Sequence, residues 1–241
     1  MAYNKEIYFI RHGETNANLE RRGQNSESVL TPNGKKQATI TGKYLKDYRL
    51  DKKFDVVYCS PFIRACETAE IICKKIGYNV DNIIYDKDLV EQDKGQLADN
   101  KTNDERKKDK KYNYMFKIDQ KLSKIKDPIE GSKMRVLNKD YLNFEKHYDM
   151  ESLLLLRKRL NRFINKVKKS KYKKILIITH NGVITRGIIP LLCNIENICG
   201  NYQYGRNCHI SYFTFSRKSA NSKYIIKLWA PPNTYHFGLY K

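Results

Sequence analysis

Apolar residues along the chain fall into short runs separated by longer amphipathic stretches. The first run, at 5–10, is β-rich and ends abruptly at Arg11-His12-Gly13. The run at 173–179 is nearly continuous in apolar side chains, which is typical of a central parallel strand covered on both faces. These patterns predict strands at 5–10, 55–59, within 80–89, at 173–179, 209–215 and 223–229.

Helical periodicity is clearest at 151–168, where basic residues lie off a single apolar stripe. Two further helix starts share one signal, a capping hydroxyl followed by proline. One is Thr31-Pro32, from which a helix would run to about Tyr48, and the other is Ser60-Pro61. Another helix is expected from 182 to Cys193. The stripe at 151–168 consists of Leu153, Leu156, Leu160, Phe163 and Val167.

The order of these elements predicts an α/β fold. Strands that alternate with helices favour a three-layer α/β/α architecture with a mostly parallel central sheet and right-handed crossovers. Residues 101–127 are polar, with ten basic and five acidic residues, and we expect a small, partly helical cap inserted at about 97–150. No linker composition divides the chain, so residues 1–241 are expected to form one domain.

The chain is strongly basic, with 47 Lys and Arg against 26 Asp and Glu and a formal net charge of +21. A basic protein often meets nucleic acid or an anionic membrane. Here Lys, Asn, Ile and Tyr are abundant throughout, so we attribute most of the charge to a compositional bias and do not expect a nucleic-acid partner. The stretch at 157–174 stands apart with ten basic residues and no acid, and it predicts a local positive field.

Composition also bears on location and on metals. The longest apolar runs, at 153–156 and 175–178, are far shorter than a membrane span, and the first residues resemble no signal peptide. Six cysteines form no Cys-x-x-Cys pair and no Cys/His metal spacing. We therefore expect a cytoplasmic protein with reduced thiols, no membrane span and no metal site.

Two histidines follow predicted strands directly, His12 after 5–10 and His180 after 173–179. In parallel sheets the functional crevice lies beyond the carboxyl ends of the strands, so both are candidates for one site. Arg11 adds a planar fork of donors suited to phosphate oxygens, and Gly13 allows close backbone approach with its N–H left for a ligand. A buried histidine with a purely structural role is the alternative at each position.

Two charged residues belong to the same edge of the predicted sheet. Arg64 falls in the first turn of a helix that follows a strand, where it opposes the helix dipole unless an anion binds there. Glu91 follows the strand within 80–89, and a partly buried carboxyl there could hold a proton for a leaving group. A surface arginine and a solvated loop acid are the plainer interpretations.

Four ordered motifs resemble the histidine phosphatase superfamily, with its phosphoglycerate-mutase-like fold. They are Arg-His-Gly-Glu-Thr at 11–15, Leu-Thr-Pro-Asn-Gly at 30–34, Ser-Pro-Phe-Ile-Arg-Ala at 60–65 and Thr-His-Asn-Gly-Val-Ile at 179–184, with Glu91 before the last. The resemblance implies that His12 is the phosphorylated nucleophile and Glu91 the proton donor and later general base.

The same resemblance implies the phosphate-binding set. Arg11, Arg64 and His180 would hold the phosphoryl group. Asn18 matches a position that often joins the pocket rim. Asn181 stands where relatives usually carry glycine, and its backbone N–H remains suited to the phosphate.

The run Glu91-Gln92-Asp93-Lys94-Gly95 resembles the phosphatase-side members of the family. We therefore expect a phosphatase that hydrolyses a small phosphorylated metabolite without a cofactor. The first alternative is a mutase primed by 2,3-bisphosphoglycerate. The second is a non-catalytic protein that binds anions or nucleic acid. The substrate, the choice between monomer and homodimer, and the role of the lysine-rich cap stay open.

Overall fold

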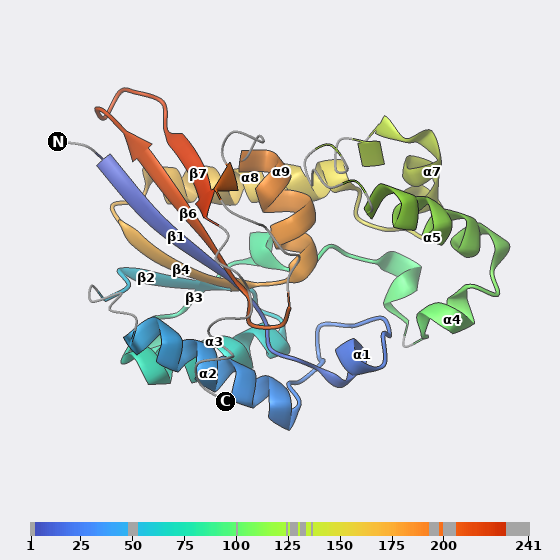
Figure 1. Ribbon diagram of the computed structural model, residues 1–241, viewed down its shortest axis with the longest axis horizontal. Helices are drawn as coiled ribbons and strands as arrows, with labels where there is room; N and C mark the ends of the chain where they lie inside the picture. Colours follow the sequence, from blue (N-terminus) through green and yellow to red (C-terminus); the bar gives the residue numbers. More distant parts are fainter. Residues whose placement is uncertain are drawn as a thin grey trace.

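A seven-stranded sheet forms the middle layer of the protein (Figure 1). The computed structural model describes residues 3–47, 53–99, 101–123, 125, 130, 134–135, 137–192, 198–199 and 206–229. The strand order is β3-β2-β4-β1-β6-β7-β5. The strands are β1 (Tyr3–Arg11), β2 (Val56–Cys59), β3 (Ile84–Tyr85), β4 (Lys174–Thr179), β5 (Ile198–Cys199), β6 (Ile210–Arg217) and β7 (Ile225–Trp229).

The sheet is mostly parallel, as predicted. β1 and β2 both pair with β4 in parallel, with Ile7 opposite Ile175 and Val57 opposite Leu176. β3 extends this parallel half beside β2. β6 runs antiparallel to β1, and β7 antiparallel to β6, so the two closing strands form the antiparallel part. All six residues of β4 are buried, which confirms its central place.

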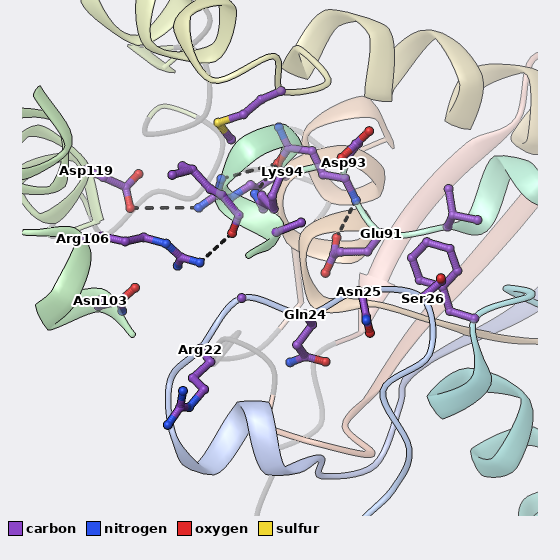
Figure 2. A pocket seen from close by; sticks show the side chains of 18 of the residues that line it. Arg22, Gln24, Asn25, Ser26, Glu91, Asp93, Lys94, Asn103, Arg106 and Asp119 are labelled. Atoms are coloured by element: carbon purple, nitrogen blue, oxygen red, sulfur yellow. Dashed lines mark hydrogen bonds and ion pairs between the residues drawn. The ribbon is translucent and has the colours of Figure 1, made fainter. Parts of the chain in front are cut away.

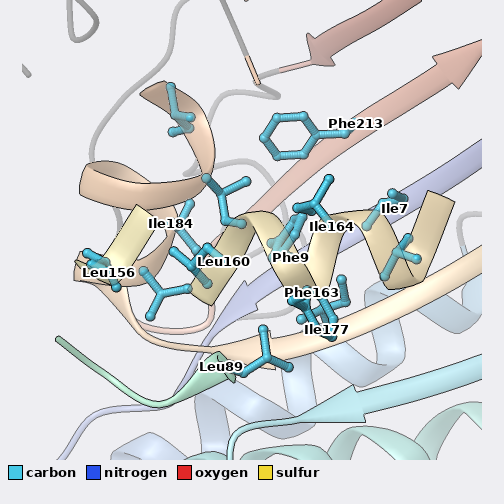
Figure 3. Close-up of a cluster of buried hydrophobic side chains, with 14 of the residues drawn as sticks. Ile7, Phe9, Leu89, Leu156, Leu160, Phe163, Ile164, Ile177, Ile184 and Phe213 are labelled. Atoms are coloured by element: carbon cyan, nitrogen blue, oxygen red, sulfur yellow. The ribbon is translucent and has the colours of Figure 1, made fainter. Parts of the chain in front are cut away.

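Helices cover both faces of this sheet (Figure 1). On one face α2 (Pro32–Asp47) and α3 (Ile63–Ile76) pack over residues such as Ile10 and Leu176. On the other face α8 (Leu153–Lys169) packs over their neighbours in sequence, including Phe9 and Ile177 (Figure 3). Alternate strand residues thus enter two separate cores, because successive side chains of a strand point to opposite faces. The expected three layers are present.

The predicted apolar stripe of α8 is fully buried. Ser152 caps the helix, since its Oγ accepts from the amide of Leu155 at 3.2 Å. The basic stretch that includes this helix is partly neutralised by neighbouring acids. Arg159 pairs with Glu151, and two further cations pair with acids beside β3. The local positive field predicted for 157–174 is therefore weaker than the sequence indicates.

Two helix starts follow different rules. Thr31 caps α2 as predicted, because its Oγ1 accepts from the amide of Gly34 at 2.9 Å. Ser60 does not cap α3, which begins at Ile63 with Phe62 at the capping position. The prediction was wrong there because the hydroxyl of Ser60 contacts His180 instead, at 2.7 Å from its Nε2.

After β4 the chain forms a short π-helical turn, Val183–Ile188, followed by α9 (Ile189–Leu192). The expected end of this helix at Cys193 lies outside the described residues, as does Tyr48 at the end of the α2 prediction. Two 3-10 turns flank the short strand β3, η1 (Val80–Asn82) and η2 (Lys87–Leu89). In the described part of the chain, no helix combines the length and the apolar character that crossing a membrane requires.

The described residues within 95–148, here called the cap, lie beyond the carboxyl ends of the parallel strands (Figure 1). Met115 and Phe144 from the cap are buried in the same core as β4 and α8, so the cap is anchored to the sheet. Its described elements are η3 (Gly95–Ala98), α4 (Asn103–Arg106), α5 (Lys110–Ser123) and α7 (Lys139–His147), and α1 (Asn16–Leu19) faces them across the site.

Candidate functional site

The carboxyl ends of β1 and β4 bring the two histidines together. His12 follows β1, its amide donates to the carbonyl of Thr179 at 2.9 Å, and its ring centroid lies 5.3 Å from that of His180. Arg64 reaches the same place from the first turn of α3, and Glu91 from the loop after η2. The two histidines lie close together because β1 and β4 are parallel neighbours whose carboxyl ends lie at the same edge of the sheet.

The hydrogen bonds of His12 define its tautomer. Nδ1 lies 2.7 Å from the carbonyl oxygen of Gly13, which can only accept, so Nδ1 carries the proton. Nε2 faces Nε of Arg64 at 3.3 Å, which can only donate. Burial, with the nearby charges of His180 and Arg64, holds the pKa of His12 well below its ordinary value of 6.5. His12 is therefore a neutral imidazole with the lone pair on Nε2.

Two guanidinium groups lie beside this ring. Burial lowers the pKa of Arg64 to about 10 and also lowers the pKa of Arg11, yet both stay charged at neutral pH. Arg64 is 1% exposed and donates to the carbonyl oxygen of Asn25 at 2.6 Å and to His12. Among the described residues no carboxylate forms an ion pair with Arg64. A buried cation with only neutral partners is a site for an anion.

Glu91 is held by two backbone amides. Its Oε1 accepts from Gln92 at 2.9 Å and its Oε2 from Gly182 at 3.2 Å. Burial by itself raises the pKa of this carboxyl, but the charge of Lys94, the two amides and Arg64 outweigh it and lower the pKa below its ordinary value. Glu91 is thus a carboxylate in the empty site.

Gly182, the residue after Asn181, positions Glu91. Its amide donates to Oε2 of Glu91. A Cβ at Gly182 would overlap the carboxylate of Glu91, so a side chain there would displace that carboxylate.

Two predictions were made for Gly13, and only one of them is confirmed. The close backbone approach is confirmed, since a Cβ there would lie 2.6 Å from the carbonyl oxygen of Gly34. Its amide, however, is not left for a ligand and donates to Oγ1 of Thr68 at 3.0 Å. The hydroxyl of Thr68 in turn donates to the carbonyl of Arg64 at 2.6 Å, so this chain of bonds joins His12's loop to α3.

His180 lies behind the cavity wall. Its Nε2 shares a hydrogen bond with Oγ of Ser60, while its buried Nδ1 has no hydrogen-bond partner among the described residues. Burial, reinforced by Arg64 and Arg11, holds the pKa of His180 well below its ordinary value. The ring is therefore a second neutral imidazole, packed against the first.

The two asparagines of the predicted phosphate-binding set do not line the cavity. Oδ1 of Asn18 accepts from the amide of Thr15 at 3.2 Å and from Nδ2 of Asn207 at 3.0 Å. Asn207 also donates to the carbonyl oxygen of His12 at 3.1 Å, so it ties α1 to the loop that carries this histidine. No motif in the sequence pointed to Asn207. Oδ1 of Asn181 is buried without a hydrogen-bond partner in the described part.

A cavity of about 630 Å³ opens above these groups. Arg11, His12, Arg64 and Glu91 belong to its lining. The loop at 22–26 forms one side, and the cap forms the opposite side (Figure 2). Helix α5 of the cap contributes three large aromatic or apolar side chains to the lining. They are Tyr112, Met115 and Phe116.

Sequence reasoning missed several polar lining residues. Lys94 and Asp119 lie on the cap side of the cavity (Figure 2). Arg186 of the π-helical turn also belongs to the lining, 4.0 Å from Asp119. Lys94 stood within a motif that had been noticed, three residues after Glu91, and this was its only signal. Arg186 and Asp119 had none, because their places depend on how the cap folds over the sheet.

This arrangement suits phosphoryl transfer. A neutral imidazole supplies a nucleophilic lone pair, two guanidinium groups can neutralise the oxygens of a phosphoryl group, and a carboxylate can exchange a proton. Within the described ranges, no group of three or more His, Cys, Asp or Glu side chains is placed to hold a metal ion.

Known proteins share parts of this sequence. A probable 2-carboxy-D-arabinitol-1-phosphatase of Arabidopsis thaliana is 41% identical over 91 residues, which are 37% of this chain and 17% of that protein. An uncharacterized phosphatase, PhoE, of Bacillus subtilis (strain 168) is 40% identical over 67 residues, 27% of this chain and 33% of that protein. The matches thus span a third or less of these relatives' own length.

Solved structures share the whole fold. A phosphoglycerate mutase from Bacillus anthracis superposes with a TM-score of 0.70 at 20% sequence identity, covering 98% of this chain and 96% of that one. The model of the histidine phosphatase superfamily, branch 1, matches residues 7–226. That span includes the carboxyl-terminal part of β1, both histidine corners, Arg64 and Glu91. This chain belongs to the histidine phosphatase superfamily, branch 1.

Proposed function

We propose that this protein is a phosphomonoesterase that works through a covalent phosphohistidine at His12. The observation that carries the proposal is the state of this side chain. A neutral, buried imidazole presents Nε2 to the cavity beside Arg64, with its proton fixed on Nδ1 by the carbonyl of Gly13. A core histidine with a structural role has no need of a cavity or of two buried cations.

The reaction proceeds in two displacements. Nε2 of His12 attacks phosphorus, the ester P–O bond breaks, and Glu91 gives the leaving oxygen a proton. Glu91 then takes a proton from water as that water attacks the phosphohistidine, which releases inorganic phosphate and regenerates the imidazole. Glu91 is ionised in the empty site, so it must gain a proton before it can protonate the leaving oxygen. A monoanionic phosphate ester supplies that proton when it binds.

Charge on the phosphoryl oxygens is stabilised by Arg11 and Arg64. Both are buried, so each interaction with the developing charge is stronger than it would be in water. His180 is the third candidate contact, through the ring next to His12. Asn18 and Asn181 stay predictions as phosphate contacts, and neither residue lines the cavity.

The alternative is a mutase in which a bisphosphoglycerate primes His12 and the phosphoryl group returns to the substrate. The cap favours it in one respect, since its apolar side chains over the cavity, including Tyr112 and Phe116, would limit the access of water. The phosphatase remains our proposal because the two relatives described above carry phosphatase names.

The test follows the phosphoryl group. The protein is charged with isotopic phosphate from an aryl ester, and the label on His12 is then timed as it passes to water or to 3-phosphoglycerate. We expect loss to water to dominate, and dominant transfer to 3-phosphoglycerate would establish the mutase instead. His12→Ala should form no adduct, whereas His147→Ala, at an exposed position on α7, should label normally. Turnover by His12→Ala within tenfold of the parent would overturn the covalent mechanism at His12.

A further inference from the structure

Lys94 lies in the cavity wall without an acidic partner. Its Nζ donates to Oε1 of Gln92 at 2.9 Å, and no carboxylate of the described residues lies within ion-pair distance of it. An ammonium group has three N–H donors, so the neutral amide leaves most of its capacity unused. Such a half-buried ammonium group is stabilised by an anion.

A second cation converges on the same amide oxygen. NH1 of Arg186 lies 3.5 Å from Oε1 of Gln92 and 3.1 Å from the hydroxyl of Tyr141. Its nearest carboxylate, Asp119, is 4.0 Å away and is bound more closely by Arg135, at 2.8 Å. The two cations thus lie side by side with one neutral acceptor between them, which is an unfavourable arrangement in an empty cavity.

The net charge of the cavity lining also favours an anionic ligand. Its lining contains six cations and three acids, a formal excess of three positive charges. Arg11 and Arg64 are used by the phosphoryl group, and Arg106 is paired with Asp99. Arg22 lies on the loop at 22–26 and is paired with Glu20. Lys94 and Arg186 remain, on the side of the cavity that would receive the rest of the substrate. The six cations are Arg11, Arg22, Arg64, Lys94, Arg106 and Arg186.

We propose that Lys94 and Arg186 form a subsite for a second anionic group, a carboxylate or a phosphate, on the leaving portion of the substrate. The inference rests on the proposed function, since it assigns the substrate class of the same cavity. The anion would accept the unused donors of Lys94 and the fork of Arg186, and it would relieve the repulsion between them. Esters of uncharged alcohols would leave Lys94 without an anionic partner and Arg186 with only its long contact to Asp119.

Binding is measured in His12→Ala protein, which cannot turn substrates over, by calorimetry near pH 6.5. Three ligands are compared: glycerol 3-phosphate, 3-phosphoglycerate, which carries a carboxylate on the same skeleton, and 1,3-propanediol bisphosphate. We expect one or both of the ligands with a second anionic group to bind ~10- to 100-fold more tightly than glycerol 3-phosphate. This factor corresponds to the usual free energy of a hydrogen bond to a charged group. The tighter of the two identifies carboxylate or phosphate as the second group.

Lys94→Met, which keeps the unbranched stem, should reduce this preference to within threefold, and Lys94→Arg should restore most of it. Lys101→Met is the control for charge, because Lys101 lies outside the cavity lining and pairs with Asp99. A preference below threefold in the His12→Ala protein, or one that survives Lys94→Met in a folded protein, would overturn the subsite.

A pH series tests the subsite without changing Lys94, should Lys94→Met fail to fold. Burial and the charge of Arg186 lower the pKa of Lys94 to about 7 in the empty site. The preference should therefore be strong below pH 7 and decline above it, as the ammonium loses its proton. Constant preference from about pH 6 to about pH 9 would contradict the role of Lys94.

The other charged groups that face Lys94 come from four elements. Arg186 has a raised pKa, and Glu91 and Asp119 have lowered ones, so these three stay charged through the series. Glu145 of α7 is the fourth, and burial raises its pKa. Turnover by the parent protein is measured separately. Absence of turnover with an intact binding preference would reject the phosphatase and keep the subsite, and the reverse result would do the opposite.

Discussion

Nε of Arg64 donates to Nε2 of His12 at 3.3 Å, so the atom that would attack phosphorus is in contact with a guanidinium group before any substrate binds. The same side chain donates to the carbonyl of Asn25 in the loop at one side of the cavity. Arg64 therefore fixes the imidazole and is placed to hold a phosphoryl oxygen, and both effects depend on the planar shape of its fork.

Arg64→Ala should lower kcat/KM for an aryl phosphate by roughly 10²–10⁴, as expected when a charged contact to the transition state is lost. Arg64→Lys should restore only part of the activity, because an ammonium group cannot span His12 and Asn25 together. Arg162→Ala, at an exposed position on α8, serves as the control. Full activity in Arg64→Lys would show that charge alone matters.

Glu91→Gln should separate the two displacements. A nitrophenyl phosphate needs little protonation of its leaving group, so His12 should still be phosphorylated, whereas an alkyl phosphate should react roughly 10²–10⁴ more slowly. Attack by water should slow as well, because the carboxylate that activates it is gone. The variant should accumulate an acid-labile, base-stable phosphohistidine from the aryl ester, detectable by mass spectrometry. Equal slowing of both esters without an adduct would transfer the role to Asp93.

Gly182→Ala should imitate the loss of Glu91 without touching its carboxyl. The added Cβ overlaps the carboxylate and displaces it from the amide that now binds it. We expect slower alkyl ester hydrolysis and some accumulation of phosphohistidine in a folded protein. Gly77→Ala is the matched control. Its φ of +71° opposes a side chain although nothing lies within 4 Å, so it should cost about 1 kcal/mol of stability and leave the kinetics unchanged.

The stability of the fold should decrease in mild acid because of His12. Above pH 6.5, the ordinary value, the ring is neutral in both folded and unfolded chains. As the pH falls below that value, only the unfolded chain takes up the proton, since the folded pKa is lowered. One such group removes about 1.4 kcal/mol of unfolding free energy between about pH 7.5 and about pH 5.5.

Urea unfolding at these two pH values checks this dependence in the parent and in His12→Gln. The variant should show a pH dependence shallower by about 1.4 kcal/mol. His180, whose pKa is lowered in the same way, should contribute a similar amount in both proteins. Equal pH dependence in parent and variant would mean that His12 is protonated in the folded state.

Local pattern was enough to predict most of the fold. The apolar stripe of α8 and the continuous apolar run of β4 leave one packing solution, helices over a parallel sheet, because each buries its apolar face only in that way. The strands then bring His12 and His180 to one edge, which the sequence order already implied. A single domain over 1–241 stays a prediction, as does the oligomeric state.

The sequence by itself determined the candidate site residues, since motif order and strand ends point to His12, Arg64 and Glu91 without knowledge of contacts. Only the tertiary structure decided the hydrogen bonds of these groups. Each polar atom near the site has several possible hydrogen-bond partners at similar distances. Ser60 bonds to His180, and Gly182 bonds to Glu91, and no local sequence rule predicts either bond. The residues that line the cavity could not be predicted either, because the cap brings side chains to the cavity from positions far apart in the sequence.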